Sequence, residues 1–495
     1  MDVQQLPNFL VKRAFLTPNR RALGFNTEEY SFKELYEKAL RIAGQLANKN
    51  IKKDDFVAVL LRNHEDTIFI FLALQLLGAR AVILNARLTA AEITWQVQDS
   101  GAVLLITEQK FEDIIMDIAK FNSDFVILTK EELFSSPYQS PKINEVVNSH
   151  DICSIMYTSG TTGHPKGVIQ TYGNHWWSAI GSALNLGITE NDCWLCAVPL
   201  FHISGYSILM KSLIYGMEML LFEAFHEERV IEEIQAQNVT IMSVVSTMAT
   251  RIVERLGNEN FPSTFRCMLL GGGPASLSLL EECVAKNIPI FQTYGMTETS
   301  SQIVTLSPED SIQKLGSAGK PLFPSQLKIV DNHHELAEQN EPGEIMVKGP
   351  NVTIGYLNNP EATKEKFVDG WLSTGDIGYL DEEGFLYVLD RRSDLIISGG
   401  ENIYPAEIEG VLTSHPDVHD AGVIGIEDEK WGQVPIAFVQ VKKERNGAEL
   451  LDFCREKLAG YKVPKQIYFV DQIPRNAAKK LLRRELREML EKGII

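Results

Sequence analysis

Apolar residues in the first part of the chain form two short β-rich runs, residues 56–60 and 81–84, on either side of a longer apolar stretch. The longer stretch follows two acidic residues and runs into Gly78, and these are start and stop signals of a helix. Gln75, Gly78 and Arg80 interrupt the apolar window, whereas a membrane span needs about 20 consecutive apolar residues. The pattern therefore predicts a buried helix followed by a strand.

The alternation of strand and helix continues through the middle of the chain. Residues 89–92, Thr-Ala-Ala-Glu, have the form of a capping box that opens a helix, and the apolar run 102–106 follows them. Such alternation is typical of parallel sheets flanked by helices. Because a similar rhythm recurs over residues 194–290, we expect two related αβα lobes. The strand-like runs of the second lobe are residues 219–222, 241–245 and 267–270.

After Gly316 the pattern changes to short strands separated by turn signals, such as Asp-Glu-Glu-Gly at residues 381–384. This pattern of short strands and turns predicts a mostly β subdomain. From Asp390 onward the chain has a shorter α+β pattern that ends in a basic, charged tail. We therefore expect an α/β protein in which residues 1–389 form the two lobes and the β subdomain, and residues 390–495 form a small second domain.

The composition is that of an ordinary soluble protein, with 44% hydrophobic and 23% charged residues in 495. Asp and Glu outnumber Lys and Arg by 65 to 47, and the net charge is −18. A surface of this sign repels nucleic acids, so we expect no nucleic-acid partner. An anionic ligand must instead be held by local donors.

The six cysteines include one close pair, Cys193-Trp194-Leu195-Cys196, which no second pair or histidine set follows. We therefore expect reduced core cysteines rather than a metal site, as is usual in a reducing compartment. Residues 1–7 lack the basic start and apolar core of a signal peptide. These features predict a cytoplasmic protein without a membrane span.

A candidate for chemistry is the run Thr158-Ser159-Gly160-Thr161-Thr162-Gly163-His164-Pro165-Lys166-Gly167. Its glycines allow close backbone approach, its hydroxyls donate hydrogen bonds and its lysine adds positive charge, as a phosphate-binding loop requires. The spacing differs from that of a Walker loop, because the second glycine is not followed directly by Lys-Ser or Lys-Thr. Composition alone leaves open a nucleotide site and a flexible turn.

This run resembles the signature loop of the adenylate-forming superfamily, which contains acyl-CoA synthetases, nonribosomal adenylation domains and firefly-type luciferases. Other motifs of that superfamily follow in the same order over nearly the full length of the chain. The resemblance implies an enzyme that activates a small carboxylic acid with ATP and Mg²⁺ and transfers the acyl group to coenzyme A. It also implies contacts with the ATP phosphates from Thr158, Ser159, Gly160, Thr161, Thr162 and Lys166.

The motif Tyr294-Gly295-Met296-Thr297-Glu298 is similar to the adenine and magnesium motif of the superfamily. By that resemblance Tyr294 stacks on adenine, Thr297 binds the α-phosphate as a catalytic residue, and Glu298 is both catalytic and a metal ligand. One or two carboxylates suit Mg²⁺ bound to phosphates, although a Thr-Glu pair alone also fits a plain helix start. The glycines expected at the nucleotide are Gly272, Gly273 and Gly295.

Further motifs imply contacts with ribose and coenzyme A. Ser373-Thr374-Gly375-Asp376 resembles the ribose motif, in which the aspartate, here Asp376, accepts hydrogen bonds from both hydroxyls. Arg391 matches a ribose-contacting arginine, and Asp390 matches the hinge about which a mobile C-terminal lid turns. Gly399 and Gly400 match a segment that lines the pantetheine tunnel.

The segment 474–483 resembles the motif of the catalytic lysine, which bridges the acyl carboxylate and the α-phosphate. Counting from its first residue, Pro474, assigns this role to Lys480. Lys479 stands where most members of the superfamily have glycine. It therefore remains an alternative for the same role.

Two features bear on the identity of the acid. His202 occupies the position where amino-acid-activating domains carry an aspartate, which argues against an amino-acid substrate. The stretches 173–179, 201–205 and 296–302 are similar to the o-succinylbenzoate–CoA ligases of menaquinone biosynthesis. This resemblance implies a pocket beside Trp176 and Trp177, with His202 also in a catalytic role. The residues expected at the acid are Trp177, His202, Ser204, Gly205, Met296 and Ser301.

Other functions share most of these motifs. A synthetase for another aromatic or medium-chain acid differs only in its pocket, a luciferase-like oxygenase consumes oxygen after adenylation, and a nucleotide-binding protein lacks turnover. The last is disfavoured because Lys166, Glu298, Asp376 and Lys480 are all present. The sequence leaves a homo-oligomer open, and no basic residue stands out in the pocket to hold a second substrate carboxylate.

Overall fold

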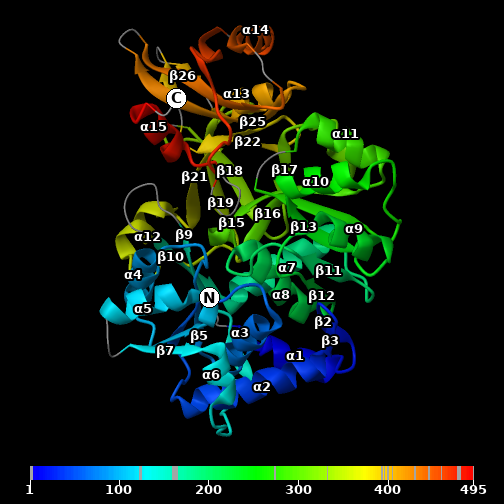
Figure 1. Cartoon of the computed structure of the whole chain (residues 1–495), viewed down its shortest axis with the longest axis vertical. Coiled ribbons are helices and arrows are strands. Elements are labelled where there is room, and N and C mark those ends of the chain that lie inside the picture. Colours follow the sequence, from blue (N-terminus) through cyan, green and yellow to red (C-terminus); the bar gives the residue numbers. More distant parts are fainter. Residues whose placement is uncertain are drawn as a thin grey trace.

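The structure is a computed structural model of the chain, shown in Figure 1. Two helix-flanked lobes lie in the lower and right-hand parts of that view, and the C-terminal part lies above them. The structure describes residues 4–121, 125–158, 165–272, 275–331, 333–391, 394, 396–398, 401–403, 405–428, 431–443, 446–458, 460–475 and 481–493.

The first lobe is built on a six-stranded sheet of order β10-β9-β5-β4-β6-β7, in which only β10 runs antiparallel to its neighbour. Helix α3 is buried all round and ends at Gly78, whose φ of 71° favours glycine. The predicted buried helix and the strand after it are therefore confirmed. The bounds are β4 (Phe56–Val59), α3 (Glu65–Leu77), β5 (Arg80–Ile83), α4 (Ala90–Ser100), β6 (Leu104–Thr107), η1 (Gln109–Phe111), α5 (Glu112–Phe121), β7 (Val126–Thr129), α6 (Lys130–Ser135), β9 (Ile152–Thr158) and β10 (Lys166–Thr171).

Both faces of this sheet are buried, which explains the unbroken apolar runs of its strands. In β4, Val57 and Val59 belong to the main core that continues toward the second lobe. Ala58 between them belongs to a separate core under α4 and α5. Helix α4 begins with the predicted capping box, in which Thr89 and Glu92 bond each other's backbone N–H groups.

The second lobe contains parallel strands in the order β15-β14-β13-β11-β12-β2, with β3 antiparallel at the edge. The predicted strands over residues 219–222, 241–245 and 267–270 are confirmed as β12, β13 and β14 within one residue at each end. The bounds are β1 (Gln5–Pro7), α1 (Phe9–Leu16), β2 (Arg21–Phe25), β3 (Glu28–Ser31), α2 (Phe32–Asn48), β8 (Val146–Asn148), α7 (Tyr172–Leu186), β11 (Cys193–Cys196), α8 (Ile203–Tyr215), β12 (Glu218–Leu221), α9 (Glu227–Gln235), β13 (Ile241–Val245), α10 (Ser246–Leu256), β14 (Cys267–Gly271), α11 (Leu277–Ala285) and β15 (Ile290–Met296).

The mostly β region expected after Gly316 is present, but it is not a separate sheet. Strand β16 runs antiparallel to β15, and β17 joins β16 to β22, so the second lobe and the β region share one 14-stranded sheet. The bounds are η2 (Thr297–Thr299), β16 (Ser301–Leu306), η3 (Pro308–Asp310), β17 (Ser317–Pro321), β18 (Gln326–Val330), β19 (Gly343–Lys348), α12 (Pro360–Lys366), β20 (Phe367–Val368), β21 (Trp371–Leu380) and β22 (Leu386–Arg391).

The C-terminal part has its own sheet, of order β24-β23-β26-β25 with β27 beside β26, and its own apolar core. Strand β22 of the large sheet runs through Asp390, the boundary expected from the sequence, and ends one residue later. Helix α13 contacts β22, so the two parts touch next to this boundary. The bounds are β23 (Ile396–Ser398), β24 (Glu401–Ile403), α13 (Pro405–Thr413), β25 (Val418–Asp428), β26 (Gly432–Val441), α14 (Gly447–Lys457), η5 (Gly460–Lys462), β27 (Ile467–Phe469) and α15 (Arg483–Glu491).

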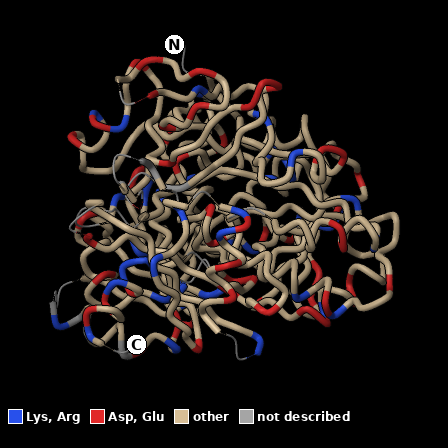
Figure 2. The backbone as a smooth tube through the Cα atoms, turned by 90° about the horizontal axis from the view of Figure 1, so that it is seen from above, with Lys and Arg blue, Asp and Glu red and all other residues tan. Residues whose placement is uncertain are grey.

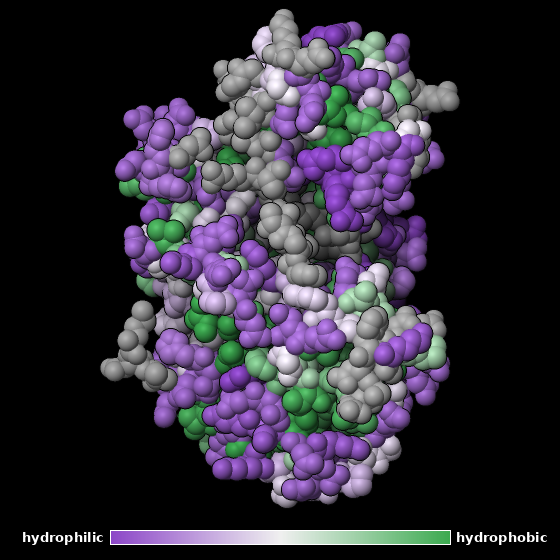
Figure 3. All heavy atoms as spheres, turned by 90° about the vertical axis from the view of Figure 1, so that its left-hand side faces the viewer, coloured by the Kyte–Doolittle hydropathy of each residue, from purple (hydrophilic) through white to green (hydrophobic). Residues whose placement is uncertain are grey.

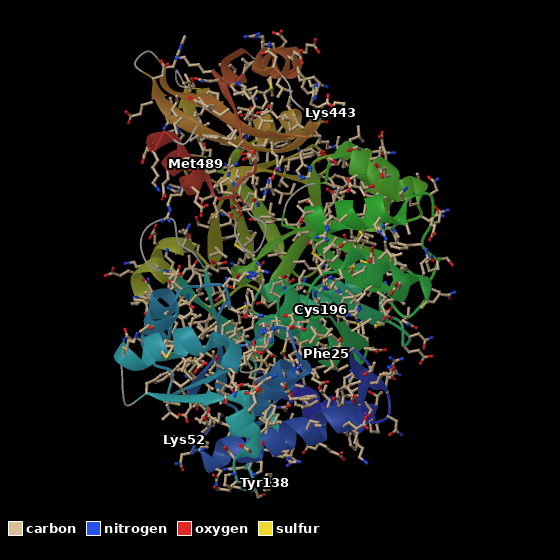
Figure 4. The ribbon with its side chains drawn as sticks, in the orientation of Figure 1. Phe25, Lys52, Tyr138, Cys196, Lys443 and Met489 are labelled. Carbon is tan, nitrogen blue, oxygen red and sulfur yellow. The ribbon has the colours of Figure 1, made fainter. Side chains whose placement is uncertain are left out.

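All six cysteines are free and buried, as expected for core residues. Burial raises the pKa of the Cys196 thiol to about 12 and that of Cys193 well above its ordinary value, which disfavours a metal-binding thiolate pair. Figure 4 shows Cys196 in the interior, whereas Lys52 and Lys443 lie at the periphery.

Charged and polar residues cover most of the surface. Acidic residues surround the whole outline in Figure 2, and the face in Figure 3 is mainly hydrophilic with separate hydrophobic patches. Across the described residues, the helices are too short or too polar to cross a bilayer.

One buried histidine makes the stability of the fold depend on pH. His175 in α7 lies against Tyr206, and its Nε2 is 3.4 Å from the hydroxyl of Ser154. Burial, assisted by the nearby charge of Lys211, lowers the pKa of His175 from 6.5 to about 3. The folded protein therefore excludes a proton that the unfolded chain takes up below pH 6.5.

We expect the free energy of unfolding to be fully present above pH 6.5 and to fall as the pH drops toward 3. The contribution of His175 is about 1.4 kcal/mol per pH unit. Urea denaturation at pH 7, 6 and 5 should give a smaller pH slope for His175→Gln than for the wild type. Equal slopes would show that His175 is not the titrating group.

Candidate active site

The glycine-rich run lies between the paired strands β9 and β10. Thr158 at the end of β9 and Lys166 at the start of β10 are direct partners in the ladder, so both ends of the run are fixed to one sheet edge. The residues between them that were expected at the phosphates lie outside the described part of the chain: Ser159, Gly160, Thr161 and Thr162.

The residues expected at the nucleoside come from three strands of the 14-stranded sheet, β15, β21 and β22. The hydroxyl of Tyr294 in β15 donates to Oδ2 of Asp376 in β21 at 2.8 Å, and Asp376 is only 7% exposed. Arg391 is the direct ladder partner of Asp376, although its side chain is not described. The structure thus brings together an aromatic ring and a carboxylate suited to a base and its ribose.

Gly272 and Gly295, two of the glycines expected at the nucleotide, favour glycine for different physical reasons. Gly272 follows β14 with a φ of +84°, a conformation that favours glycine, and among the described residues a Cβ there would meet Val245 at 3.7 Å. A Cβ on Gly295 would lie 2.1 Å from the carbonyl oxygen of Ser301, so that glycine allows β15 and β16 to approach closely. Gly273 lies outside the described residues.

The carboxylate expected at magnesium is Glu298 in η2. It is half-buried, and its Oε1 accepts a hydrogen bond from the hydroxyl of Tyr356 at 3.2 Å. The ammonium of Lys166 lies 5.4 Å from the centre of the Tyr356 ring. A fixed carboxylate oxygen beside Thr297 and a nearby cation fit a Mg²⁺–phosphate group, which takes one or two protein carboxylates. Sequence motifs did not indicate Tyr356, because its role depends on contacts across the fold.

The turn between β15 and β16 has a strained backbone. Ser300 and Ser301 have φ values of 53° and 99°, which non-glycine residues seldom adopt. Three hydrogen bonds hold this turn: Ser178 Oγ donates to the Ser300 carbonyl at 2.7 Å, Thr299 Oγ1 to the Ser301 carbonyl at 2.6 Å, and Asn351 Nδ2 to the Thr299 carbonyl at 3.2 Å. Strain maintained in this way is common in ligand-binding segments.

His202 directly precedes α8 and is half-buried. Burial, with Arg87 nearby, lowers the pKa of His202 to about 4, so the ring is neutral at pH 7. Its Nε2 is buried and forms no hydrogen bond with the described residues. Such an atom is usually satisfied by a ligand or water. The helix carries Ser204 and Gly205 next, and a Cβ on Gly205 would lie 2.3 Å from the carbonyl oxygen of Pro199.

The two tryptophans of α7 are neighbours in sequence, and both were expected beside the acid. Trp176 is half-buried and packs against the main core, with its ring centroid 6.0 Å from that of Phe9. Its place beside the acid pocket stays a prediction. Trp177 is half-buried. Its place at the acid stays a prediction, as does that of Met296.

A buried cation that sequence reasoning missed lies behind this region. Lys211 in α8 is 2% exposed, its Nζ donates to Oε1 of Gln302 at 3.2 Å, and it lies 4.9 Å from the Trp194 ring centre. Burial lowers the pKa of Lys211 to about 7. Lys211 comes two helical turns after Ser204 and so faces the same side. The sequence signal for this site was a single lysine in α8, a helix with no other charged residue.

Several expected residues of the C-terminal part lie outside the described chain: Gly399, Gly400, Lys479 and Lys480. The hinge residue Asp390 is described only as backbone within β22. Arg475 and Leu481, which flank the segment that contains Lys480, form an antiparallel bridge. Arg475 also makes a two-point ion pair with Asp420 at 2.7 and 2.8 Å.

Two family models match the chain. The model described as AMP-binding enzyme matches residues 10–357, and the model described as AMP-binding enzyme C-terminal domain matches residues 407–480. A 2-succinylbenzoate–CoA ligase of Geobacillus sp. (strain WCH70) is 55% identical over 487 residues, which are 98% of each chain.

The o-succinylbenzoate CoA synthetase (MenE) of Bacillus subtilis is 50% identical to this chain. Its structure with the acyl-adenylate intermediate OSB-AMP has a TM-score of 0.93 and covers 98% of this chain and 99% of that one. A double mutant of it bound to a product analogue covers the same shares, 98% and 99%, with a TM-score of 0.77. The arrangement of this chain is thus similar to that of the adenylate complex.

Proposed function

The chain belongs to the AMP-binding enzyme family, and we propose that it is an ATP-dependent ligase that converts o-succinylbenzoate to its coenzyme A thioester in menaquinone biosynthesis. The observation that carries this proposal is the match of sequence and fold, over almost the whole chain, to a synthetase solved with its acyl-adenylate. The region around His202 and Lys211 agrees with an acid that is both aromatic and anionic.

The reaction has two steps at one site. An oxygen of the substrate carboxylate attacks the α-phosphorus of ATP, and pyrophosphate leaves. The thiol of coenzyme A then attacks the acyl carbon, AMP leaves and the thiol proton is released. Because the first step joins two anions, the enzyme must supply positive charge and orientation.

The charges proposed for the first step come from both domains. Lys166 and the glycine-rich run hold the phosphates, Lys480 bridges the carboxylate and the α-phosphate, and Thr297 donates to the same phosphate. Glu298 holds Mg²⁺, which neutralises phosphate charge when bound. Tyr294 and Asp376 hold the nucleoside, and their contact with each other supports this assignment.

The second step requires the C-terminal domain to turn about Asp390 and bring Gly399 and Gly400 to the pantetheine arm. Support comes from the two structures of the same relative, whose resemblance to this chain falls from a TM-score of 0.93 to 0.77 at equal identity. A rearrangement of large parts lowers a TM-score in this way, whereas two substitutions leave the identity at 50%.

The second carboxylate of o-succinylbenzoate needs a partner, because an unpaired charge in a buried site is costly. We assign this role to Lys211. It lies behind the turn that carries Ser301, and its hydrogen bond to Gln302, the next residue, places it against that turn. His202 is neutral and supplies a hydrogen-bonding nitrogen at the same pocket.

A panel of acids tests the proposed function. We expect pyrophosphate release with o-succinylbenzoate, and a thioester only when coenzyme A is added. Benzoate and octanoate should give rates lower by at least about a hundredfold, because they leave Lys211 unpaired. Turnover of either one together with failure of o-succinylbenzoate would overturn the assigned acid. Oxygen consumption or light emission would indicate the luciferase-like alternative.

The role of Lys480 is tested by separating the two steps. Lys480→Ala should slow adenylation by about a hundredfold or more, the scale of losing a preorganised charge donor. Thioester formation from a supplied acyl adenylate should survive. Lys479→Ala is the matched control and should change neither step appreciably. In single-turnover assays, a larger defect in Lys479→Ala would move the role to that lysine.

The proposed role of Lys211 is tested by removing its positive charge. Lys211→Met should lower kcat/KM for o-succinylbenzoate by about thirtyfold, the scale of a lost charged hydrogen bond, and spare 3-benzoylpropionate, which lacks the second carboxylate. In the wild type, Lys211 loses its proton above its pKa of about 7. The ratio of kcat/KM for the two acids should therefore fall as the pH rises above 7.

The matched control is Arg87→Met. Arg87 is an exposed cation 6.0 Å from the Phe201 ring centre, at the His202 side of the same pocket. If its loss, and not that of Lys211, abolished discrimination between the two acids, the second carboxylate would be held there.

A further inference from the structure

Residues 353–357 lie along β10, the edge strand of the first sheet. Val168 of β10 and Tyr356 form an antiparallel bridge. On either side of it, the N–H of Leu357 donates to the Gly167 carbonyl at 2.8 Å and the N–H of Ile169 to the Gly355 carbonyl at 3.1 Å. The segment is thus paired to the strand that follows the glycine-rich run.

The same segment also holds η2, which belongs to the other sheet. The N–H of Thr353 donates to the carbonyl of Glu298 at 2.7 Å. The hydroxyl of Tyr356 donates to the carboxylate of Glu298 at 3.2 Å. Both the backbone and the side chain of Glu298 are therefore positioned by a segment that is itself paired to β10.

The side chain of Tyr356 has little freedom. It is 7% exposed and packs with Val168 and Ala362 in a small apolar cluster. Its own N–H donates to Oγ1 of Thr363 at 3.0 Å, which fixes the backbone beneath it. The ring face is turned toward the ammonium of Lys166 at 5.4 Å, within the range of a cation–π contact.

We propose that Tyr356 is a positioning residue that sets the Glu298 carboxylate and the Lys166 ammonium in one fixed relation, so that the magnesium and phosphate contacts are assembled before ATP binds. The proposal rests on the roles given above to Glu298 and Lys166. The hydroxyl orients the carboxylate and the ring orients the cation. The two contributions belong to different atoms of one side chain, so they can be removed separately.

The test measures nucleotide binding and needs no acid substrate. The affinity for α,β-methylene-ATP is measured by calorimetry with excess EDTA and with saturating Mg²⁺, and the ratio of the two affinities gives the gain from magnesium. Tyr356→Phe keeps the ring and loses the hydroxyl. Its gain should fall by about fivefold, the scale of one hydrogen bond, while binding in EDTA stays at the wild-type value.

Tyr356→Leu loses the ring as well. It should show the same reduced gain and, in addition, an affinity in EDTA lower by about threefold, because Lys166 is no longer held by a ring face. Thermal unfolding of each variant establishes that the protein is folded under the conditions of the titration.

Tyr157→Phe is the matched control. Tyr157 lies in β9, and its hydroxyl also donates to a carboxylate, Oδ2 of Asp99, at 2.6 Å. It should bind the analogue like the wild type under both conditions. A wild-type gain from magnesium in Tyr356→Phe would overturn the proposal, as would equal EDTA affinities of Tyr356→Phe and Tyr356→Leu.

Failure of this inference and failure of the proposed function are distinguishable. A chain that makes no thioester from o-succinylbenzoate, but shows the expected pattern of magnesium gains, refutes the assigned acid and supports the role of Tyr356. A chain that makes the thioester while Tyr356→Phe keeps the full magnesium gain refutes only the role of Tyr356.

Discussion

The candidate site depends on one reversal of the chain, the tight return from β15 to β16. Strand β15 is the last parallel strand of its sheet, and β16 comes back antiparallel so close that Gly295 has no room for a side chain. Ligands of α/β sheets bind beyond the carboxyl ends of the strands. Because the chain reverses there, Tyr294, Glu298 and Ser301 are delivered to one place by a single turn. The proposed nucleoside, metal and acid contacts are therefore not independent features of the fold.

Two lysines near this turn offer local positive charge in a protein whose net charge is negative. The net charge of −18 repels anions in general, whereas Lys166 and the buried Lys211 offer local positive charge. A lysine whose pKa burial has lowered to about 7 is only partly charged by itself. An anionic group bound beside it stabilises the charged form. If Lys211 pairs with the second carboxylate as proposed, the affinity for that carboxylate is coupled to a proton, whereas an uncharged group gains nothing there.

What the sequence predicts well is local. The capping box at Thr89, the helix stop at Gly78 and the strand periodicity each depend on residues close together in the chain. The fusion of the β region with the second sheet, the packing of Trp176 against Phe9 and the buried position of Lys211 depend on partners far away in sequence. Tyr356 is the clearest case, because Glu298 and Lys166 meet it only after two sheets have formed. Resemblance to a family identified the motif residues. It did not identify the side chains that position them, such as that of Tyr356.

The proposed catalytic residue, Lys480, belongs to a segment whose described ends are both held by one strand of the C-terminal sheet. Leu481, the residue after Lys480, is bridged to Arg475 and packs with Ile424 of β25. The ion pair of Arg475 with Asp420 ties the other side of the same segment to that strand. Both described ends of the segment that contains Lys480 are therefore attached to one sheet. The proposed turn of the C-terminal domain about Asp390 would carry this segment along with that sheet, as a hinge motion of a packed domain does.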